Sequence, residues 1–283
     1  MTGFWRAFRG ELYLLRSRRS IRRAHILVAL VAILHVVGSY FILQAQAGID
    51  DLKPEDLSGW NFWPRVAAGT RAAMYFVEVV VLALIAGSFP SEISSGVVRD
   101  PLVRRISRPS FTLARSLAAM ILPLTLYAVA VGFAWMTAGA LFDGGPILDE
   151  GDIIFDEVDV QEPIELALLH GIPAILALGA FAVALSVTFR KGVIAVGVGL
   201  GVILSARILQ EPLGEHAPWF FADTLAGLGP DSFLEQAAGF SLGLSNYYPE
   251  SFDAVVAKGW YAPLPTLAAF IFVALLLFRR KSL

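Results

Sequence analysis

Cysteine is absent from the sequence, and charged residues make up only 16% of it. The absence of cysteine excludes a disulfide framework and a thiolate metal site. The scarcity of charge, with a hydrophobic share of 57% and a mean hydropathy of +0.67, lies outside what soluble domains usually show. Alternating ten-residue segments, which build membrane β-barrels, are also missing. The composition therefore predicts a helical protein that lies in a lipid bilayer.

Six apolar runs are long enough to cross about 30 Å of hydrocarbon as helices. They cover residues 25–47, 66–89, 111–141, 163–189, 192–210 and 260–278. We therefore expect an all-α integral membrane fold, with residues 1–283 forming a single transmembrane domain. Residues 211–259 are too few for a separate folded domain, and we expect them to form an extracytoplasmic loop with short amphipathic helices in the outer leaflet.

Basic residues are concentrated on one side of the predicted membrane. Seventeen of the 22 Lys and Arg residues precede the first span, lie between alternate spans or follow the last one. Because Lys and Arg are retained on the cytoplasmic side, this pattern places both termini in the cytoplasm, and the expected location is the inner (cytoplasmic) membrane. Acidic residues collect on the other side, above all in residues 143–165. There we favour a solvated acidic face over a Ca²⁺ site, because the ligand spacing of a calcium loop is missing.

Residues 4–23 form a basic segment before the first predicted span. One helical stripe of this segment is apolar and carries Phe4, Trp5, Phe8, Leu12 and Leu15. Charged residues, among them Glu11, lie on the other faces. This pattern is typical of a helix that lies in the membrane interface. The alternative is a basic tail that only sets the orientation of the first span.

The loop after the second predicted span is short, polar and rich in arginine. Asp100 before Pro101 is a helix-start signal, because a carboxylate accepts free backbone N–H groups and proline suits the first helical position. One face of this helix carries Leu102, Val103 and Ile106, and the other faces carry Arg104, Arg105 and Arg108. Pro109 is expected to end the helix at Arg108. Such a helix could sit in a cleft of a cytosolic partner, or bind anionic lipid as an ordinary basic loop.

Two segments of the sequence resemble a known family of membrane proteins. The run Arg9-Gly10-Glu11-Leu12, followed by Leu14-Leu15-Arg16-Ser17-Arg18-Arg19, is similar to "R-K-E-L…R-S-R" before the first span of that family. Glu92, Gly96 and Ile106-Ser107-Arg108 resemble "E…G-T…P-I-S-R…G-K" after its second span, with Ala114-Arg115 where Gly-Lys is usual. The chain departs from the pattern where Arg99-Asp100-Pro101 interrupts a leucine-rich run and where Arg105 replaces a proline. With its six-span architecture, the chain thus resembles the type-2 ATP-binding-cassette (ABC) permeases, the membrane subunits of exporters.

The resemblance implies efflux of an unidentified substrate, with ATP and Mg²⁺ bound by a separate ABC ATPase subunit. It implies that a short cytoplasmic coupling helix contacts this ATPase, and it assigns the contact to Glu92, Gly96, Asp100, Leu102, Arg104, Arg105, Ser107 and Arg108. It also implies a second permease chain, the same or different, and no nucleic-acid partner. The sequence lacks G-x-x-x-x-G-K-[ST], so the chain has no P-loop of its own and is not expected to be an enzyme or to bind a cofactor.

Glu78 lies near the middle of the second predicted span. An ionised side chain at that depth costs about 2.5–3.5 kcal/mol unless it is paired, protonated or exposed to water. Tyr75 and Arg71 share its helical face. Two interpretations remain open. Tyr75 and Glu78 line a substrate path or proton site, or Glu78 is a hydrogen-bonded carboxyl that fixes helix packing.

Two other function classes compete with a permease. An intramembrane enzyme needs a convergent set of catalytic side chains, whereas Glu78, His35 and His170 are scattered along the chain. The two histidines also lack a second ligand three or four residues away, so no metal site is expected. The other class is a non-ABC membrane scaffold or a secondary carrier. A carrier should show inverted repeats, and the sequence shows no clear repeat.

Overall fold

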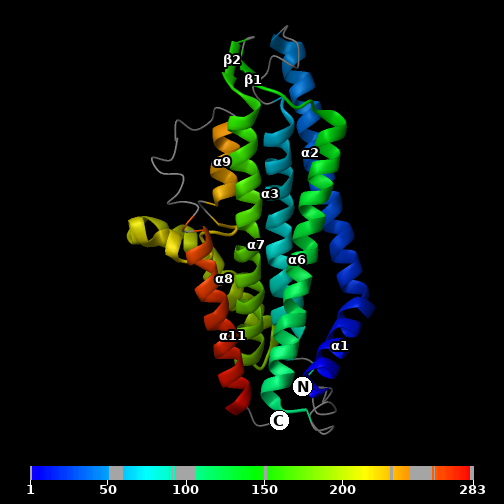
Figure 1. The fold of residues 1–283 in the computed structure, drawn as a ribbon, viewed down its shortest axis with the longest axis vertical. Helices are drawn as coiled ribbons and strands as arrows, with labels where there is room; N and C mark the ends of the chain where they lie inside the picture. Colours follow the sequence, from blue (N-terminus) through cyan, green and yellow to red (C-terminus); the bar gives the residue numbers. More distant parts are fainter. Residues whose placement is uncertain are drawn as a thin grey trace.

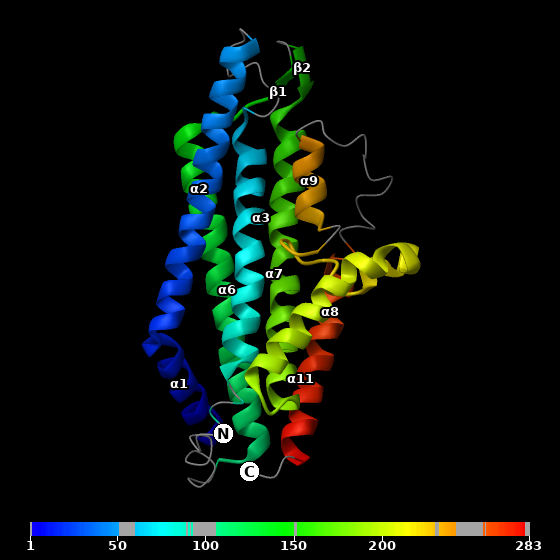
Figure 2. The same ribbon diagram turned by 180° about the vertical axis from the view of Figure 1, so that it is seen from behind.

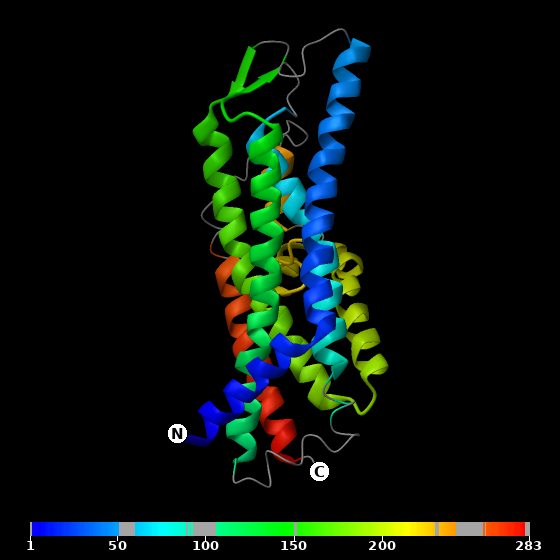
Figure 3. The same cartoon turned by 90° about the vertical axis from the view of Figure 1, so that its right-hand side faces the viewer.

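The computed structural model describes residues 2–50, 60–88, 90, 92, 106–149, 152–229, 232–241, 257 and 259–280. Its body is a bundle of long helices that run up and down in turn (Figure 1). They are α2 (Arg19–Asp50), α3 (Phe62–Val81), α6 (Arg108–Leu141) and α7 (Glu157–Thr188). Helix α11 (Pro263–Arg280) packs against α7 and α6. Helix α1 (Thr2–Ser17) crosses the beginning of α6 obliquely (Figure 3).

Five helices in the described part of the chain are long and apolar enough to cross a membrane. They run over Arg19–Ile49, Phe62–Ala86, Arg108–Leu141, Glu157–Thr188 and Gly259–Arg279. The prediction of a helical, membrane-spanning protein is therefore confirmed, with five candidate spans. The predicted span 192–210 falls in α8 (Gly192–Leu213), whose apolar part, Gly192–Ala206, is shorter than the others. Because α8 also leans away from the bundle (Figure 2), the sixth span stays a prediction.

The two ends of the bundle differ in composition. Helix α1 and the end of α11 lie at the same end (Figures 1 and 3), which carries most of the arginines and which we call the basic end. Aromatic side chains cluster towards the opposite end, where Trp63 packs against Trp135. The helical paths from Arg23 to Gln44 and from Trp260 to Arg279 are each about 30 Å long, close to the thickness of the hydrocarbon layer. Basic residues next to apolar helices, and tryptophans near helix ends, are typical of membrane-spanning proteins.

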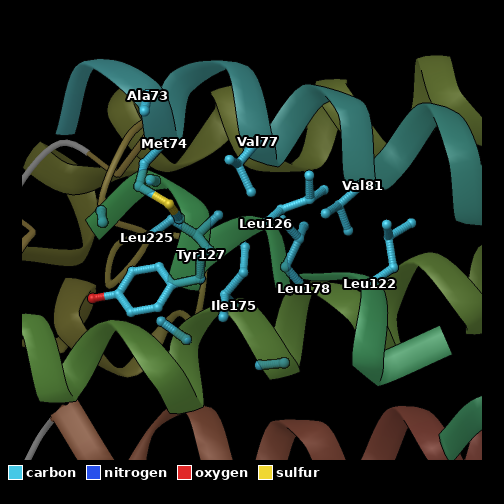
Figure 4. Packing of buried hydrophobic residues seen from close by; sticks show 14 of the residues in the cluster. Ala73, Met74, Val77, Val81, Leu122, Leu126, Tyr127, Ile175, Leu178 and Leu225 are labelled. Atoms are coloured by element: carbon cyan, nitrogen blue, oxygen red, sulfur yellow. The ribbon is translucent and has the colours of Figure 1, made fainter. Parts of the chain in front are cut away.

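The hydrophobic core forms where α3, α6 and α7 meet, and α7 is the most buried of the candidate spans. Figure 4 shows the side chains that interlock there, among them Met74, Val77, Leu126 and Leu178. Small residues allow the helices to approach closely, as is usual inside membranes. At Gly69 of α3 an added Cβ would lie 2.5 Å from a methyl group of Val36. The position therefore requires glycine for α3 to pack against α2.

A short antiparallel hairpin lies at the end of the bundle opposite the basic end, between α6 and α7 (Figure 1). It pairs β1 (Ile147–Asp149) with β2 (Asp152–Phe155). Asn61 links this region to α3, because its side chain accepts from the Trp63 N–H and donates to the Gly145 carbonyl at 2.8 Å. The acidic segment, predicted to form a solvated acidic face, thus holds this hairpin and the first turn of α7. In that turn, Glu157 and Asp159 suit the positive end of the helix dipole.

After α8 the chain turns back towards the bundle (Figure 2). A 3₁₀ helix, η3 (Gly214–Trp219), leads into turns over residues 220–229, which we call the returning segment. Phe221 and Leu225 of this segment are buried in the core. Helix α9 (Phe233–Ser241) then packs along α3 and α7. Residues 211–259, expected to form an outer loop, therefore include a segment that fills the interior of the bundle.

Candidate functional site

Four charged side chains meet at the basic end and form what we call the charge cluster. They are Glu11 of α1, Arg18 at the junction of α1 and α2, Glu92 after α3, and Arg115 of α6. Arg115 Nη1 lies 2.6 Å from Glu92 Oε2 and 3.3 Å from Glu11 Oε1, while Arg18 Nη2 contacts Glu92 Oε1. Arg115 Nη2 also donates to the Ser88 hydroxyl at 3.4 Å. The cluster joins the N-terminal segment, which holds Glu11 and Arg18, to Glu92 and Arg115, which lie 74 to 104 residues further along the chain.

The start of α6 positions Arg115 on the inner side of this cluster. The Ser107 hydroxyl caps α6 by accepting from the Ser110 N–H, and Pro109 occupies the first turn. The predicted end of the coupling helix at Arg108 is therefore wrong, because Ile106 and Ser107 are not helical and Arg108 begins α6. The reason is that proline fits the first turn of a helix better than its end. The other predicted coupling residues, Gly96, Asp100, Leu102, Arg104 and Arg105, lie outside the described residues.

The charge cluster is largely shielded from solvent. The side chains of Arg115, Glu11 and Glu92 are only 12%, 14% and 14% exposed. Burial raises the pKa of Glu11 above its usual value, although Arg115 opposes this shift. Burial alone would also raise the pKa of Glu92, but Arg115 and Arg18 together hold it below its usual value. Two cations and two anions thus balance in a space of low polarity.

The lowered pKa of Glu92 predicts how stability depends on pH. A carboxyl with a lower pKa in the folded than in the unfolded chain stabilises the fold above its ordinary value of 4.5, and this contribution is lost as the pH falls through the folded value. We expect Glu92→Gln to lower the unfolding temperature of the detergent-purified chain at pH 7, and the difference from wild type to shrink steadily below about pH 4.5. Glu162→Gln, at an exposed acid of α7, is the control. A deficit of Glu92→Gln that is equal at every pH would contradict the assignment.

The predicted interfacial stripe is present in α1, where it is divided between two environments. Phe4, Phe8 and Leu15 pack against the core, Leu12 is half-buried, and Trp5 remains 53% exposed. Glu11, placed off the stripe from the sequence, turns inward to Arg115. Arg18 and Arg115 were not chosen as site residues from the sequence. Both lie in the segments that resemble the permease family, so the signal for them was present.

A second group of polar side chains lies on one face of α3 and holds the returning segment. Both oxygens of the fully buried Glu78 carboxylate accept backbone hydrogen bonds, from Gly227 N at 2.8 Å and from Leu228 N at 2.7 Å. One to two turns away, Arg71 Nη2 lies 2.5 Å from Glu235 Oε1 of α9 and donates to the Tyr75 hydroxyl at 3.2 Å. The polar face of α3 that the sequence predicted thus contacts a segment of the chain that lies about 150 residues further along.

Gly227 makes this contact possible because the returning segment lies directly on the α3 backbone. A Cβ at Gly227 would lie 2.4 Å from Tyr75 N and 2.5 Å from the Met74 carbonyl carbon. The hydrogen bonds of Glu78 are those expected of a carboxyl that fixes packing. Its role beside a substrate path stays a prediction. No pattern in the sequence pointed to Gly227 and Leu228 as partners of Glu78, or to Glu235 as the partner of Arg71, because these contacts are long-range.

A metal site would need several ligating side chains close together. Within the described ranges, no three His, Asp or Glu residues are grouped in this way. His170 is instead surrounded by aromatic rings, with Phe233 at 5.2 Å and Trp260 at 5.6 Å between ring centroids. The polar interactions of the two groups described above are therefore ion pairs between side chains and hydrogen bonds from backbone N–H groups to Glu78.

Comparison with known families gives one finding, which concerns most of the chain. A family model described as "Protein of unknown function (DUF2705)" matches residues 25–282. The chain belongs to the DUF2705 family. The DUF2705 match covers Glu92, Arg115, Glu78 and Gly227, but it begins after α1 and so leaves out Glu11 and Arg18. A comparison with curated proteins finds no match.

Proposed function

We propose that the chain is the membrane-spanning permease subunit of an ABC exporter, driven by ATP hydrolysis in a separate ATPase subunit. The observation that carries the proposal is the charge cluster. Glu11 and Arg18 come from the motif before the first span, and Glu92 and Arg115 come from the motif region after the second span. Motifs that resemble one family and lie about 100 residues apart are joined by direct ion pairs. Ion pairs between the two motif regions are what we expect if these regions move together during transport.

The charge cluster suggests how force would pass from the ATPase to the spans. In this proposal the ATPase contacts the segment between Glu92 and the start of α6, which carries the predicted coupling residues. Displacement of this segment therefore acts on Arg115 through Glu92, and Arg115 carries it to α6 and, through Glu11, to α1. A buried ion pair transmits such a displacement because separating its charges without water is costly.

The rest of the proposal follows the same framework. Both termini and the basic end are cytoplasmic, α8 with the returning segment completes the sixth crossing, and a second permease chain completes the transport path in the inner membrane. Tyr75 and Glu78 border this path, with Glu78 holding the segment that lines it. The basic residues at the end that carries the termini support this orientation.

Co-purification tests the proposal directly. The tagged full-length chain is solubilised from its native membranes, and P-loop ATPases recovered with it are quantified by mass spectrometry. We expect one ABC ATPase to be recovered with the wild type, and its recovery to fall at least about tenfold for Arg104→Glu/Arg105→Glu, because opposing charge at a docking face costs several kcal/mol. Arg22→Glu/Arg23→Glu is the matched control, with two exposed arginines at the same end. The proposal fails if no ABC ATPase is recovered, or if both double variants lose it equally.

A further inference from the structure

A groove of about 600 Å³ opens at the basic end between the end of α3 and the start of α8. Its walls are mainly apolar, with Leu84 of the π-helical turn η2 (Leu82–Ala86) on one side and Val193 and Val196 of α8 on the other. Arg18 and Ser88 are the polar side chains among its described lining residues. A volume of this size is typical of small-molecule sites.

The groove lies beside a close contact between the start of α8 and the chain that continues α3. At Gly192 an added Cβ would lie 2.6 Å from the Gly87 carbonyl oxygen, so the start of α8 rests directly on the end of α3. At Gly199, two turns further along α8, an added Cβ would lie 3.0 Å from the Leu82 side chain, so α8 stays close to η2 over this stretch. Beyond it, α8 leans away from the bundle (Figure 2). The packing of Gly87 on Gly192 therefore fixes the width of the groove at its basic end.

Basic side chains lie in the lining of the groove and next to it. Arg18 lines the groove and its side chain keeps 33% of its exposure although it contacts Glu92. Arg190 and Lys191 are exposed and directly precede Gly192. The acids Glu92 and Glu11 are engaged with Arg18 and Arg115. An apolar groove with cations in its lining and next to it has the chemistry of a phospholipid with a negative headgroup.

We propose that this groove binds an anionic phospholipid of the leaflet at the basic end. The phosphate lies against Arg18 and Lys191, and one acyl chain runs between Leu84 and Val196. Basic pockets between transmembrane helices on the cytoplasmic side are known to take such headgroups. Arginine and lysine both suit the task, arginine through its planar fork and lysine as a compact charge.

The site has a consequence for the charge cluster, because Arg18 belongs to both. A phosphate that binds Arg18 weakens the contact of Arg18 with Glu92. Conversely, a displacement of Glu92 leaves Arg18 available to bind the phosphate. Such coupling is reciprocal. Lipid binding therefore biases the position of the chain after α3, whatever else binds there.

The test uses the full-length chain purified in detergent, with retained lipid measured by native mass spectrometry after addition of phosphatidylglycerol or phosphatidylcholine. We expect the wild type to retain one phosphatidylglycerol in preference to phosphatidylcholine. Lys191→Gln should weaken this binding about fivefold, the effect of ~1 kcal/mol per basic residue near the surface. Val196→Trp should abolish it by filling the groove, whereas Val198→Trp, at a 38% exposed position outside the groove lining, should leave it unchanged.

Three results would overturn the proposal. One is equal retention of the two lipids by the wild type. Another is unchanged retention by Val196→Trp in a sample that unfolds at the same temperature as wild type. The third is full retention by Lys191→Gln, which alters an exposed side chain and should fold normally even if Val196→Trp does not. Because the measurement needs no ATPase, its outcome is independent of the permease proposal.

Discussion

Replacing Gly227 with alanine should detach the returning segment from α3 and destabilise the protein by at least about 3 kcal/mol. The methyl group would meet Tyr75 N and the Met74 carbonyl carbon, and neither backbone atom can move without distorting α3. The segment must instead shift outward, which lengthens the two hydrogen bonds to Glu78. Overpacking alone costs about 1–3 kcal/mol, and a buried carboxylate that loses its donors adds to it.

The measurement is thermal or denaturant unfolding of the purified chain, together with hydrogen exchange of the amides in residues 220–229. Gly239→Ala in α9 is a matched control, because a Cβ there has no atom within 4 Å and alanine favours a helix. We expect Gly227→Ala to speed exchange in the returning segment and Gly239→Ala to leave it unchanged. A Gly227→Ala chain as stable as wild type would show that the returning segment is not held on α3.

Glu78→Gln provides a second measure of the same contact. The amide keeps the shape of the carboxyl, but its NH₂ group meets a backbone donor where an acceptor is needed. Residues that share one interaction do not act additively. We therefore expect the Glu78→Gln/Gly227→Ala double variant to be less destabilised than the sum of the two single variants.

Arg115→Ala is expected to have the other large effect, a loss of about 3–5 kcal/mol in the free energy of unfolding. Removing the guanidinium leaves Glu11 and Glu92 with reduced compensation, and both carboxylates are only 14% exposed. The loss should appear as a lower unfolding temperature of the purified chain. Arg23→Ala, which removes an exposed arginine of α2, should change stability by less than about 0.5 kcal/mol.

Two further variants show whether charge or packing causes this loss. Arg115→Lys keeps the charge but not the two-pronged contact with Glu92 and Ser88, so an intermediate stability is expected. Glu11→Gln introduced into Arg115→Ala should restore part of the stability, because it removes one of two like charges. If Glu11→Gln restores nothing, the arginine acts through packing and the electrostatic account of the charge cluster is wrong.

The sequence predicted the helices well because hydropathy and length determine them. Long apolar runs flanked by basic residues predicted the five candidate spans. They could do so because a chain in lipid must pair its backbone groups within a helix. The polar face of Arg71, Tyr75 and Glu78 could also be identified, because helical spacing alone places these residues together. The stripe of α1 followed from the same periodicity.

Features that depend on contacts between distant segments could not be predicted. Nothing local to Glu78 shows that its partners are Gly227 and Leu228, because that pairing is set by how α8 leaves the bundle and the chain returns. The same holds for the meeting of Glu11 with Arg115. The wrong prediction at Pro109, that a helix ends there, has another cause. Proline occurs both just after helices and in their first turn, and here the Ser107 hydroxyl caps the helix that begins at Arg108.

The length of the central helices exceeds what the lipid requires. Helix α6 has 34 residues and therefore extends about 51 Å, whereas the hydrocarbon layer is about 30 Å thick. Roughly 20 Å of helix must stand in water or among headgroups. The hairpin and the Asn61 linkage brace the end opposite the basic end. A molecule that leaves or approaches the membrane on that side would meet a rigid rim of protein before it meets lipid.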